Sequence, residues 1–176
     1  MHGIILFGKP GSGKSTIGKL FAQMYDYDYI SSGDIARHMA ENDPQVSSML
    51  AGGGMAPEMV MRSMIKHEIN RRVLSNRNFV LDGFPRFDYQ DMLLTDGFPD
   101  MAFVRVLIDV SDDVAVNRSM KRNRDDDGAI MKRLEYYHNN TEKLTKDCVI
   151  VIDNNDEHEA YEMADKLYLE VSDKCH

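Results

Sequence analysis

The chain has 176 residues, with 21 basic and 29 acidic side chains and a formal net charge of -8 at pH 7. This length suits one domain that buries roughly 70% of the surface of its unfolded chain. The acidic excess argues against a general nucleic-acid-binding surface, and no stretch approaches the ~20 apolar residues of a membrane span. The two cysteines are too few for a disulfide scaffold or a four-thiolate zinc site. We therefore expect a cytoplasmic protein without structural zinc that binds neither nucleic acid nor a membrane.

An apolar run at residues 3–7 leads directly into the glycine-rich sequence GKPGSGKST, residues 8–16. The spacing is that of a P-loop: glycine, four residues, then Gly-Lys-Ser/Thr. Glycines allow the loop to curl so that successive N–H groups point at one anion, and Lys14 adds a positive charge. A helix that begins near Ser15 would direct the positive end of its dipole at the same phosphate. The motif indicates binding of a nucleoside triphosphate.

Short β-rich runs alternate with helical stretches along the rest of the chain. We expect strands at residues 3–7, 27–30, 79–81, 103–108 and 149–152. Start signals predict helices from 57–58 to about 74, after Ser111, over 130–144 after the acidic residues 125–127, and from 156–157 onward. This order predicts an α/β protein of the P-loop NTPase type: a five-stranded parallel sheet with helices on both faces and ligands at the carboxyl ends of the strands.

A second motif, NFVLDGFPRFDYQ, occupies residues 78–90. Asp82 ends an apolar strand, so we expect its carboxylate at the same edge of the sheet as the P-loop, where it could hold magnesium through water. Gly83 would let a ligand approach the backbone, and Pro85 would stiffen the loop that presents Arg86. The glycines at 52–54 are compatible either with a tight turn or with a backbone contact to ligand.

The sequence Asp82-Gly83-Phe84-Pro85-Arg86, together with Gln90, resembles the signature of adenylate kinases and their nucleoside monophosphate kinase relatives. Three other segments resemble that family in the same order: ISSGDIAR at 30–37, GGMAPEMV at 53–60 and RSMKRNRDDDGAIMKRLEYY at 118–137. The resemblance covers nearly the whole chain. It implies a single P-loop kinase domain, 1–176, with a helical segment that binds the nucleoside monophosphate (NMP) at 31–74 and a short lid at 118–133.

The resemblance also implies a role for each matched residue. ATP would be bound by Gly11, Ser12, Gly13, Lys14, Ser15, Thr16, Arg118 and Arg122. AMP would be bound by Ser32, Gly33, Arg37, Gly54, Met55, Ala56, Gly83, Phe84, Arg86, Gln90, Arg124 and Arg133. The catalytic residues would be Lys14, Arg86, Arg122, Arg124 and Arg133. Mg²⁺, brought with ATP, would be held by Ser15 and Asp82, partly through water.

The implied reaction is reversible phosphoryl transfer from Mg-ATP to AMP, giving two ADP, in a monomeric enzyme. It needs no catalytic base, because a nucleoside monophosphate has a second pKa near ~6 and is already an anionic nucleophile at neutral pH. In the family, glutamine at the position of Gln90 accompanies adenine. Three alternatives remain open: a UMP/CMP or mixed-specificity kinase, a P-loop ATPase or regulatory module without an acceptor, and a catalytically weak relative kept for binding.

The sequence departs from the family pattern in several places. Adenylate kinases usually have Gly-Lys-Gly-Thr where this chain has Gly-Lys-Ser-Thr, so either Ser15 or Thr16 could serve the metal. Lys9 is an unusual charge inside the loop, and residues 153–155 replace a glycine near the donor base. The arginines at 122, 124 and 133 would, without the resemblance, be interpreted as surface ion pairs. Arg71 and Arg72 match no motif, and we expect both on the surface.

Overall fold

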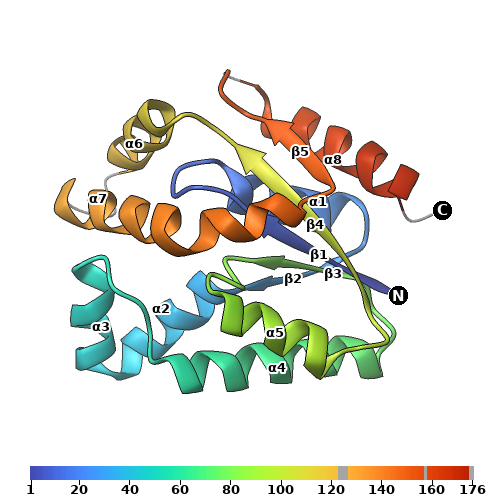
Figure 1. Ribbon diagram of the computed structural model, residues 1–176, viewed down its shortest axis with the longest axis horizontal. Coiled ribbons are helices and arrows are strands. Elements are labelled where there is room, and N and C mark those ends of the chain that lie inside the picture. Colours follow the sequence, from blue (N-terminus) through green and yellow to red (C-terminus); the bar gives the residue numbers. More distant parts are fainter. Residues whose placement is uncertain (123–126, 157, 175–176) are drawn as a thin grey trace.

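Five parallel strands form one sheet, in the order β2-β3-β1-β4-β5, in the computed structural model of the chain (Figure 1). The structure describes residues 1–122, 127–156 and 158–174. The strands are β1 His2–Phe7, β2 Asp28–Ser31, β3 Phe79–Asp82, β4 Ala102–Asp109 and β5 Ile150–Asp153. Every strand boundary therefore lies within one residue of its prediction, and the predicted α/β fold is confirmed.

The helices follow the strands in the expected alternation. They are α1 Lys14–Met24, α2 Ser32–Asn42, α3 Pro44–Ala51, α4 Glu58–Leu74, α5 Asp88–Gly97, α6 Asp112–Lys121, α7 Asp127–Tyr136 and α8 Ala160–Lys174. The predicted N-cap of α6 is confirmed, since the Ser111 hydroxyl accepts a hydrogen bond from Val114 N. The prediction for α8 was wrong by four residues: Asp156 lies in a bend before the helix, and its carbonyl accepts a hydrogen bond from Arg118.

The stretch predicted as one helix over 130–144 contains three kinds of turn. Helix α7 continues as a π-helical turn at Tyr137–Thr141 and then as a 3₁₀ helix at Glu142–Asp147. A π-helical turn inserts an extra residue into the helix and is often found at functional sites. Here it carries Thr141, whose hydroxyl donates to the carbonyl of Arg86 at 3.2 Å. The irregular turn therefore meets the loop that follows β3.

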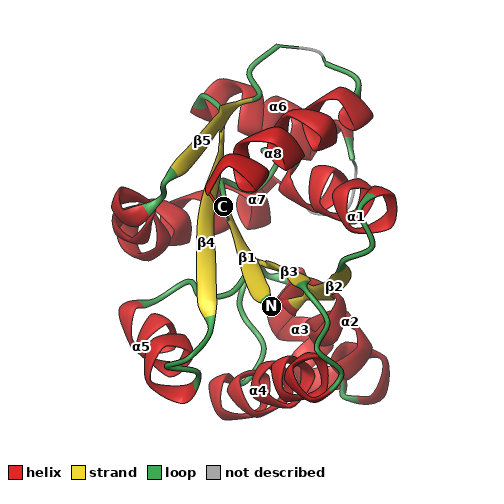
Figure 2. Cartoon of the chain, turned by 90° about the vertical axis from the view of Figure 1, so that its right-hand side faces the viewer, coloured by secondary structure: helices red, strands yellow, loops and turns green. Residues whose placement is uncertain are grey.

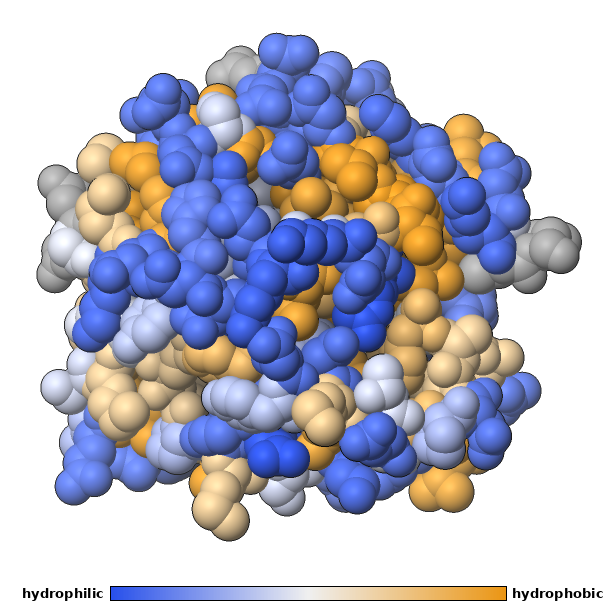
Figure 3. Space-filling model, viewed as in Figure 1, coloured by the Kyte–Doolittle hydropathy of each residue, from blue (hydrophilic) through white to orange (hydrophobic). Residues whose placement is uncertain are grey.

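Alternate side chains of the strands enter two separate apolar layers. Ile4 and Leu6 of β1 pack with α1 and α8 on one face, whereas Ile5 and Phe7 pack with α2, α4 and α5 on the other. Figure 2 shows the sheet edge between these helical layers. Both faces are thus covered, as near-continuous apolar strands require. On the outer surface, hydrophilic residues cover most of the face in Figure 3, with hydrophobic residues between them.

The sheet topology places the ends of β1 and β3 together. Leu6 of β1 pairs with Asp82 on one side and with Val106 of β4 on the other. The chain leaves β1 toward β2 on one side and later adds β4 and β5 on the other, so the carboxyl end of β1 is the topological switch point. Among the described residues, no helix is long and apolar enough to cross a bilayer.

Leu81, at the centre of the layer formed with α2, α4 and α5, offers a direct test of this packing. It is fully buried (0% exposed) in β3. We expect Leu81→Ala to lower the free energy of unfolding by about 2–5 kcal/mol, because the cavity can close only partly. Urea unfolding measures this difference. The matched control is Leu74→Ala, whose side chain is 87% exposed and should change stability by no more than about 0.5 kcal/mol. Equal effects of the two substitutions would contradict the described core.

Candidate active site

The P-loop is fixed by backbone conformations that only glycine adopts easily. Gly11 and Gly13 have φ angles of 84° and 91°. A Cβ on Gly11 would lie 2.2 Å from the carbonyl oxygen of Ala115 in α6, so the loop packs directly against that helix. Gly13 is the N-cap of α1 and, having no side chain, makes no cap hydrogen bond. The N–H groups of its first turn therefore remain suited to a phosphate.

Two side chains, one outside the motif and one within it, hold the loop in place. The buried Asn154, after β5, donates from Nδ2 to the carbonyl of Ser12 at 2.8 Å. Lys9 Nζ donates to the carbonyl of Val110 at 2.7 Å and pairs with Asp112 Oδ1 at 2.7 Å. The unusual charge of Lys9 thus anchors the loop to the start of α6. Neither contact was evident from the sequence, because both partners come from distant segments.

Asp82 lies where the motif predicted, at the end of β3 beside the P-loop. It is only 3% exposed. Its Oδ2 accepts hydrogen bonds from the hydroxyl of Ser15 and from Tyr29 Oη, the latter at 2.6 Å. Its Oδ1 is buried and has no hydrogen-bond partner among the described residues. Such a carboxylate oxygen is costly unless a ligand or ordered water satisfies it.

These oxygens fit a magnesium ion that arrives with a nucleotide. Mg²⁺ is usually held by one or two carboxylates, substrate phosphates and several waters. The unpaired oxygen of Asp82 and the hydroxyl of Ser15 are the oxygen ligands that the protein itself could supply. The structure places Ser15, rather than Thr16, in contact with Asp82. In the described part of the chain, no three His, Cys, Asp or Glu side chains converge to form an all-protein metal site.

Cationic side chains converge around Asp82 from several elements. Burial lowers the pKa of Lys14, with the Asp82 carboxylate opposing this change and the charges of Arg86 and Arg122 adding to it. Burial likewise lowers the pKa of Arg86, opposed by Asp82 and assisted by Arg133. The Asp82 carboxylate thus interacts with Lys14 and Arg86, which in turn interact with Arg122 and Arg133. Such a concentration of positive charge is stabilised by a bound polyanion.

The acceptor side of the predicted site is built around Gly83. Its carbonyl accepts hydrogen bonds from Ser32 Oγ at 2.7 Å and from Arg86 Nε at 2.8 Å. A Cβ on Gly83 would lie 2.5 Å from Ser32 Oγ, and Gly83 has a φ of 77°. Arg37, by contrast, is 59% exposed and forms an ion pair with Asp34. Binding of a phosphate by Arg37 would compete with that pair.

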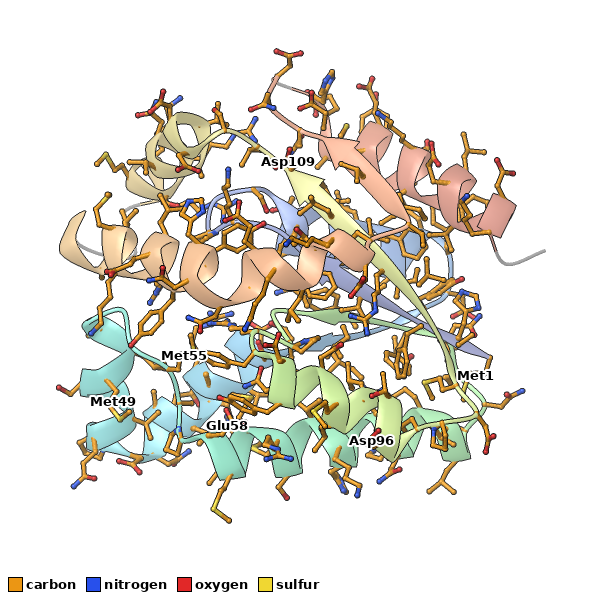
Figure 4. The ribbon with its side chains drawn as sticks, viewed as in Figure 1. Met1, Met49, Met55, Glu58, Asp96 and Asp109 are labelled. Carbon is orange, nitrogen blue, oxygen red and sulfur yellow. The ribbon has the colours of Figure 1, made fainter. Side chains whose placement is uncertain are left out.

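The glycines at 52–54 form a tight turn. Gly53 and Gly54 donate their N–H groups to the carbonyls of Leu50 and Met49. Gly53 has a φ of 73°, and a Cβ there would lie 2.8 Å from the backbone oxygen of Ala129 in α7. Met55 and Ala56, half-buried, follow the turn. Figure 4 shows Met55 and Glu58 in the stretch that leads from this turn into α4.

Gln90 is buried and held at both ends of its amide. Its Oε1 accepts from Arg86 N at 2.7 Å, and its Nε2 donates to Glu58 Oε2 at 2.8 Å. The predicted base-reading residue therefore has a fixed orientation. Glu58 had no assigned role, although its place at the start of α4 lies within the segment that resembles the family.

A cavity of about 500 Å³ lies on the side predicted to bind the donor, between the P-loop helix, α6 and the start of α8. Its walls include Thr16, Arg118, Arg122, Asn154 and His158. Arg118 donates to the backbone carbonyls of residues 154–156. Its guanidinium therefore orders the loop after β5 as well as lining the cavity.

The remaining predicted arginines have mixed outcomes. Arg133 is half-buried, and its NH2 group donates to the carbonyl of Leu50 at 3.0 Å. Arg124 lies outside the described residues.

The expectation that Arg72 is a surface residue was wrong: its side chain is 14% exposed and pairs with Asp28 and Glu68. Spacing alone could not reveal this, because the Asp28 partner is 44 positions away in the sequence.

The chain is similar to known proteins over most of its length. Residues 6–148 match the family model described as adenylate kinase. An adenylate kinase from Trichodesmium erythraeum (strain IMS101) is 30% identical over 171 residues, which cover 86% of this chain and 89% of that protein. One from Pyrococcus furiosus is 36% identical over 118 residues, but the match covers 65% of this chain and 51% of that protein. Some curated relatives are thus matched over only about half of their length.

A solved structure of similar fold is the unliganded sugar kinase from Janibacter sp. HTCC2649. Its TM-score is 0.72 at 14% sequence identity, with 98% of this chain and 95% of that chain covered. At this identity the similarity shows the fold alone. The fold, the P-loop and the family match define a phosphotransferase of the nucleoside monophosphate kinase class. With residues 6–148 matched, the chain belongs to the adenylate kinase family.

His138, in the π-helical turn, lies between two carboxylates near the anchor of the P-loop. Its ring nitrogens are 2.9 Å from Glu142 Oε2 and 3.1 Å from Asp112 Oδ2. The hydrogen bond to Glu142, with the charges of both acids, raises the pKa of His138 above its ordinary value of 6.5. The folded state therefore binds this proton more tightly than the unfolded chain does.

The stabilisation by this proton should be fully present below pH ~6.5 and be lost as pH rises through the folded-state pKa. We expect the free energy of unfolding of the wild type to fall, relative to that of His138→Gln, between pH ~5.5 and ~8.5. Urea unfolding across that range measures it. The control His67→Gln, on the exposed side of α4, should keep the wild-type dependence. Parallel curves for wild type and His138→Gln would contradict the expectation.

Proposed function

We propose that the protein is an adenylate kinase, which reversibly transfers a phosphoryl group from Mg-ATP to AMP and gives two ADP. The observation that carries the choice of AMP is the fixed amide of Gln90. An amide offers two donors and two acceptor lone pairs. Arg86 N occupies one lone pair and Glu58 occupies one N–H, so within the described residues one acceptor lone pair and one N–H of the amide are left for a base.

The orientation of this amide cannot be reversed without loss. Rotation by half a turn would set the amide NH2 against the N–H of Arg86 and its oxygen against the Glu58 carboxylate, and both contacts would be repulsive. A fixed donor and acceptor suit a base with an amino group beside an unprotonated ring nitrogen, as in adenine and cytosine. Uracil presents the reverse order. The family association of glutamine with adenine then favours AMP over CMP.

The chain's own residues supply alignment and charge rather than proton transfer. The P-loop N–H groups and Lys14 would hold the donor phosphates, while Arg37 and Arg86 would grip the acceptor phosphate with paired hydrogen bonds. Arg122, Arg124 and Arg133 would offset negative charge on the group in transfer. The metal, when bound through Ser15 and Asp82, neutralises phosphate charge. Packing of the arginine segments over the site would exclude water, which otherwise accepts the phosphoryl group.

The alternatives make different demands on the site. A P-loop ATPase has no use for the cluster of Ser32, Gly83 and Arg86 beside the triphosphate loop. A UMP kinase would need a reversed amide at Gln90. The short lid at 118–133, the helical NMP-binding segment at 31–74, the monomeric state and the cytoplasmic location stay predictions. ATP, AMP and ADP are the proposed small-molecule partners.

The reaction is tested by coupled measurement of ADP formation from Mg-ATP with AMP, CMP, UMP or GMP, each against a control without acceptor. We expect AMP to be preferred and Arg86→Ala to lower kcat/KM for AMP about 100-fold or more, because a half-buried donor to the acceptor phosphate is lost. The matched control Arg71→Ala removes a guanidinium that is 64% exposed and should leave the rate unchanged. ADP formation that is equal with and without acceptor would identify a hydrolase instead.

The orientation of Gln90 is tested by Glu58→Gln. This substitution removes the charge that holds Gln90 Nε2, and hydrogen bonds to charged groups contribute about 1.5–3 kcal/mol. We expect kcat/KM for AMP to fall about 10-fold or more while that for UMP falls less, so the AMP/UMP ratio decreases. Glu41→Gln, which alters an exposed partner of His38, is the control. An unchanged AMP/UMP ratio would mean that Glu58 does not set the acceptor preference.

A further inference from the structure

Tyr29 is the second hydroxyl donor to the buried carboxylate of Asp82. Its Oη lies 2.6 Å from Asp82 Oδ2, the same oxygen that accepts the hydrogen bond of Ser15. No motif singled out Tyr29, and the resemblance gives it no role. Because both donors use one oxygen, the other oxygen of the carboxylate is the one left without a partner in the part of the chain that the structure describes.

The position of the Tyr29 ring is set by its surroundings. In the parallel register Tyr29 pairs with Val80 and Ser31 pairs with Asp82, so the side chain reaches along β3 toward the carboxyl end of the sheet. A Cβ on Gly18 of α1 would lie 3.1 Å from the ring, and Lys19 Nζ lies 5.4 Å from its centroid. The ring is thus packed against the helix that follows the P-loop.

The hydrogen bond between Tyr29 and Asp82 has only one possible direction. A carboxylate oxygen accepts, so the Tyr29 hydroxyl donates to Asp82 Oδ2. Two donors on one oxygen restrict the rotation of the carboxylate, in the way that outer partners orient metal ligands in other proteins.

We propose that Tyr29 is a positioning residue for the magnesium of the nucleotide complex: by holding Asp82 Oδ2, it would leave Oδ1 available to the bound metal and its waters. Ser15, whose hydrogen is donated to Asp82, would keep its oxygen lone pairs for the ion. The inference rests on the proposed use of Mg-ATP. It concerns the donor half of the site and is independent of which nucleotide accepts the phosphoryl group.

The test is the affinity for ATP, measured by calorimetry once with Mg²⁺ and once with EDTA, in wild type and Tyr29→Phe. The substitution removes one oxygen and keeps the ring. In EDTA, we expect wild type and Tyr29→Phe to bind ATP with similar affinity. The ratio of the dissociation constant in EDTA to that with Mg²⁺ measures how much the metal strengthens binding. We expect Tyr29→Phe to lower this ratio about 10-fold or more, as for other residues that orient metal ligands. In an Asp82→Asn background, Tyr29→Phe should lower the ratio no further.

The control is Tyr25→Phe, which removes a hydroxyl that bonds Asp165 of α8, far along the chain from the P-loop. It should leave the ratio unchanged. A ratio that Tyr29→Phe does not lower, including equal losses with Mg²⁺ and with EDTA, overturns the proposal and indicates a purely structural role. If urea titration shows that Tyr29→Phe is unfolded, Tyr29→Met replaces it, and the same change in the ratio is expected.

The two proposals fail separately. Absence of AMP-dependent ADP formation by the wild type would overturn the proposed function, yet the binding ratio would still decide the role of Tyr29. Conversely, an unchanged ratio in an enzyme that phosphorylates AMP would overturn only the role of Tyr29.

Discussion

The interaction on which the site depends is the attraction between one buried carboxylate and the cations that surround it. The Asp82 carboxylate lies near Lys14 and Arg86, and its charge opposes the lowering of their pKa values by burial. Placing several cations close together without an anion would destabilise the fold. Asp82 supplies a partial counter-charge in the free protein, and nucleotide phosphates would complete it. The same site is thereby compatible with folding and with polyanion binding.

The sheet holds the P-loop and Asp82 next to each other. Parallel register brings Leu6 beside Asp82, so the P-loop and the carboxylate leave the sheet at adjacent points. The rigid apolar layers beneath them, formed by strand residues such as Ile4 and Ile5, limit movement of the two loops. The charges therefore stay close because of packing that takes place elsewhere in the molecule.

The sequence predicted the strands, most helices and the position of Asp82, because apolar runs, glycine spacing and capping residues are local signals. It did not predict the contacts of Tyr29, Glu58 or Asn154, since each bonds a partner from another element through a single polar atom. The start of α8 was also misplaced. Acidic residues at 156–157 resemble a helix start, but the carbonyl of Asp156 is bound by Arg118, a long-range contact that no local pattern encodes.

The turn at Gly53 joins two halves of the site that are far apart in the sequence. Its backbone packs against Ala129, and Arg133 of the same helix donates to the carbonyl of Leu50. Helix α7 and the end of α3 therefore share a boundary, and displacement of either must break this hydrogen bond or carry the other along. Linkage requires such coupling to be reciprocal: a ligand that binds one of these two segments and favours this contact is itself bound more tightly, by the same free energy, when the contact is formed.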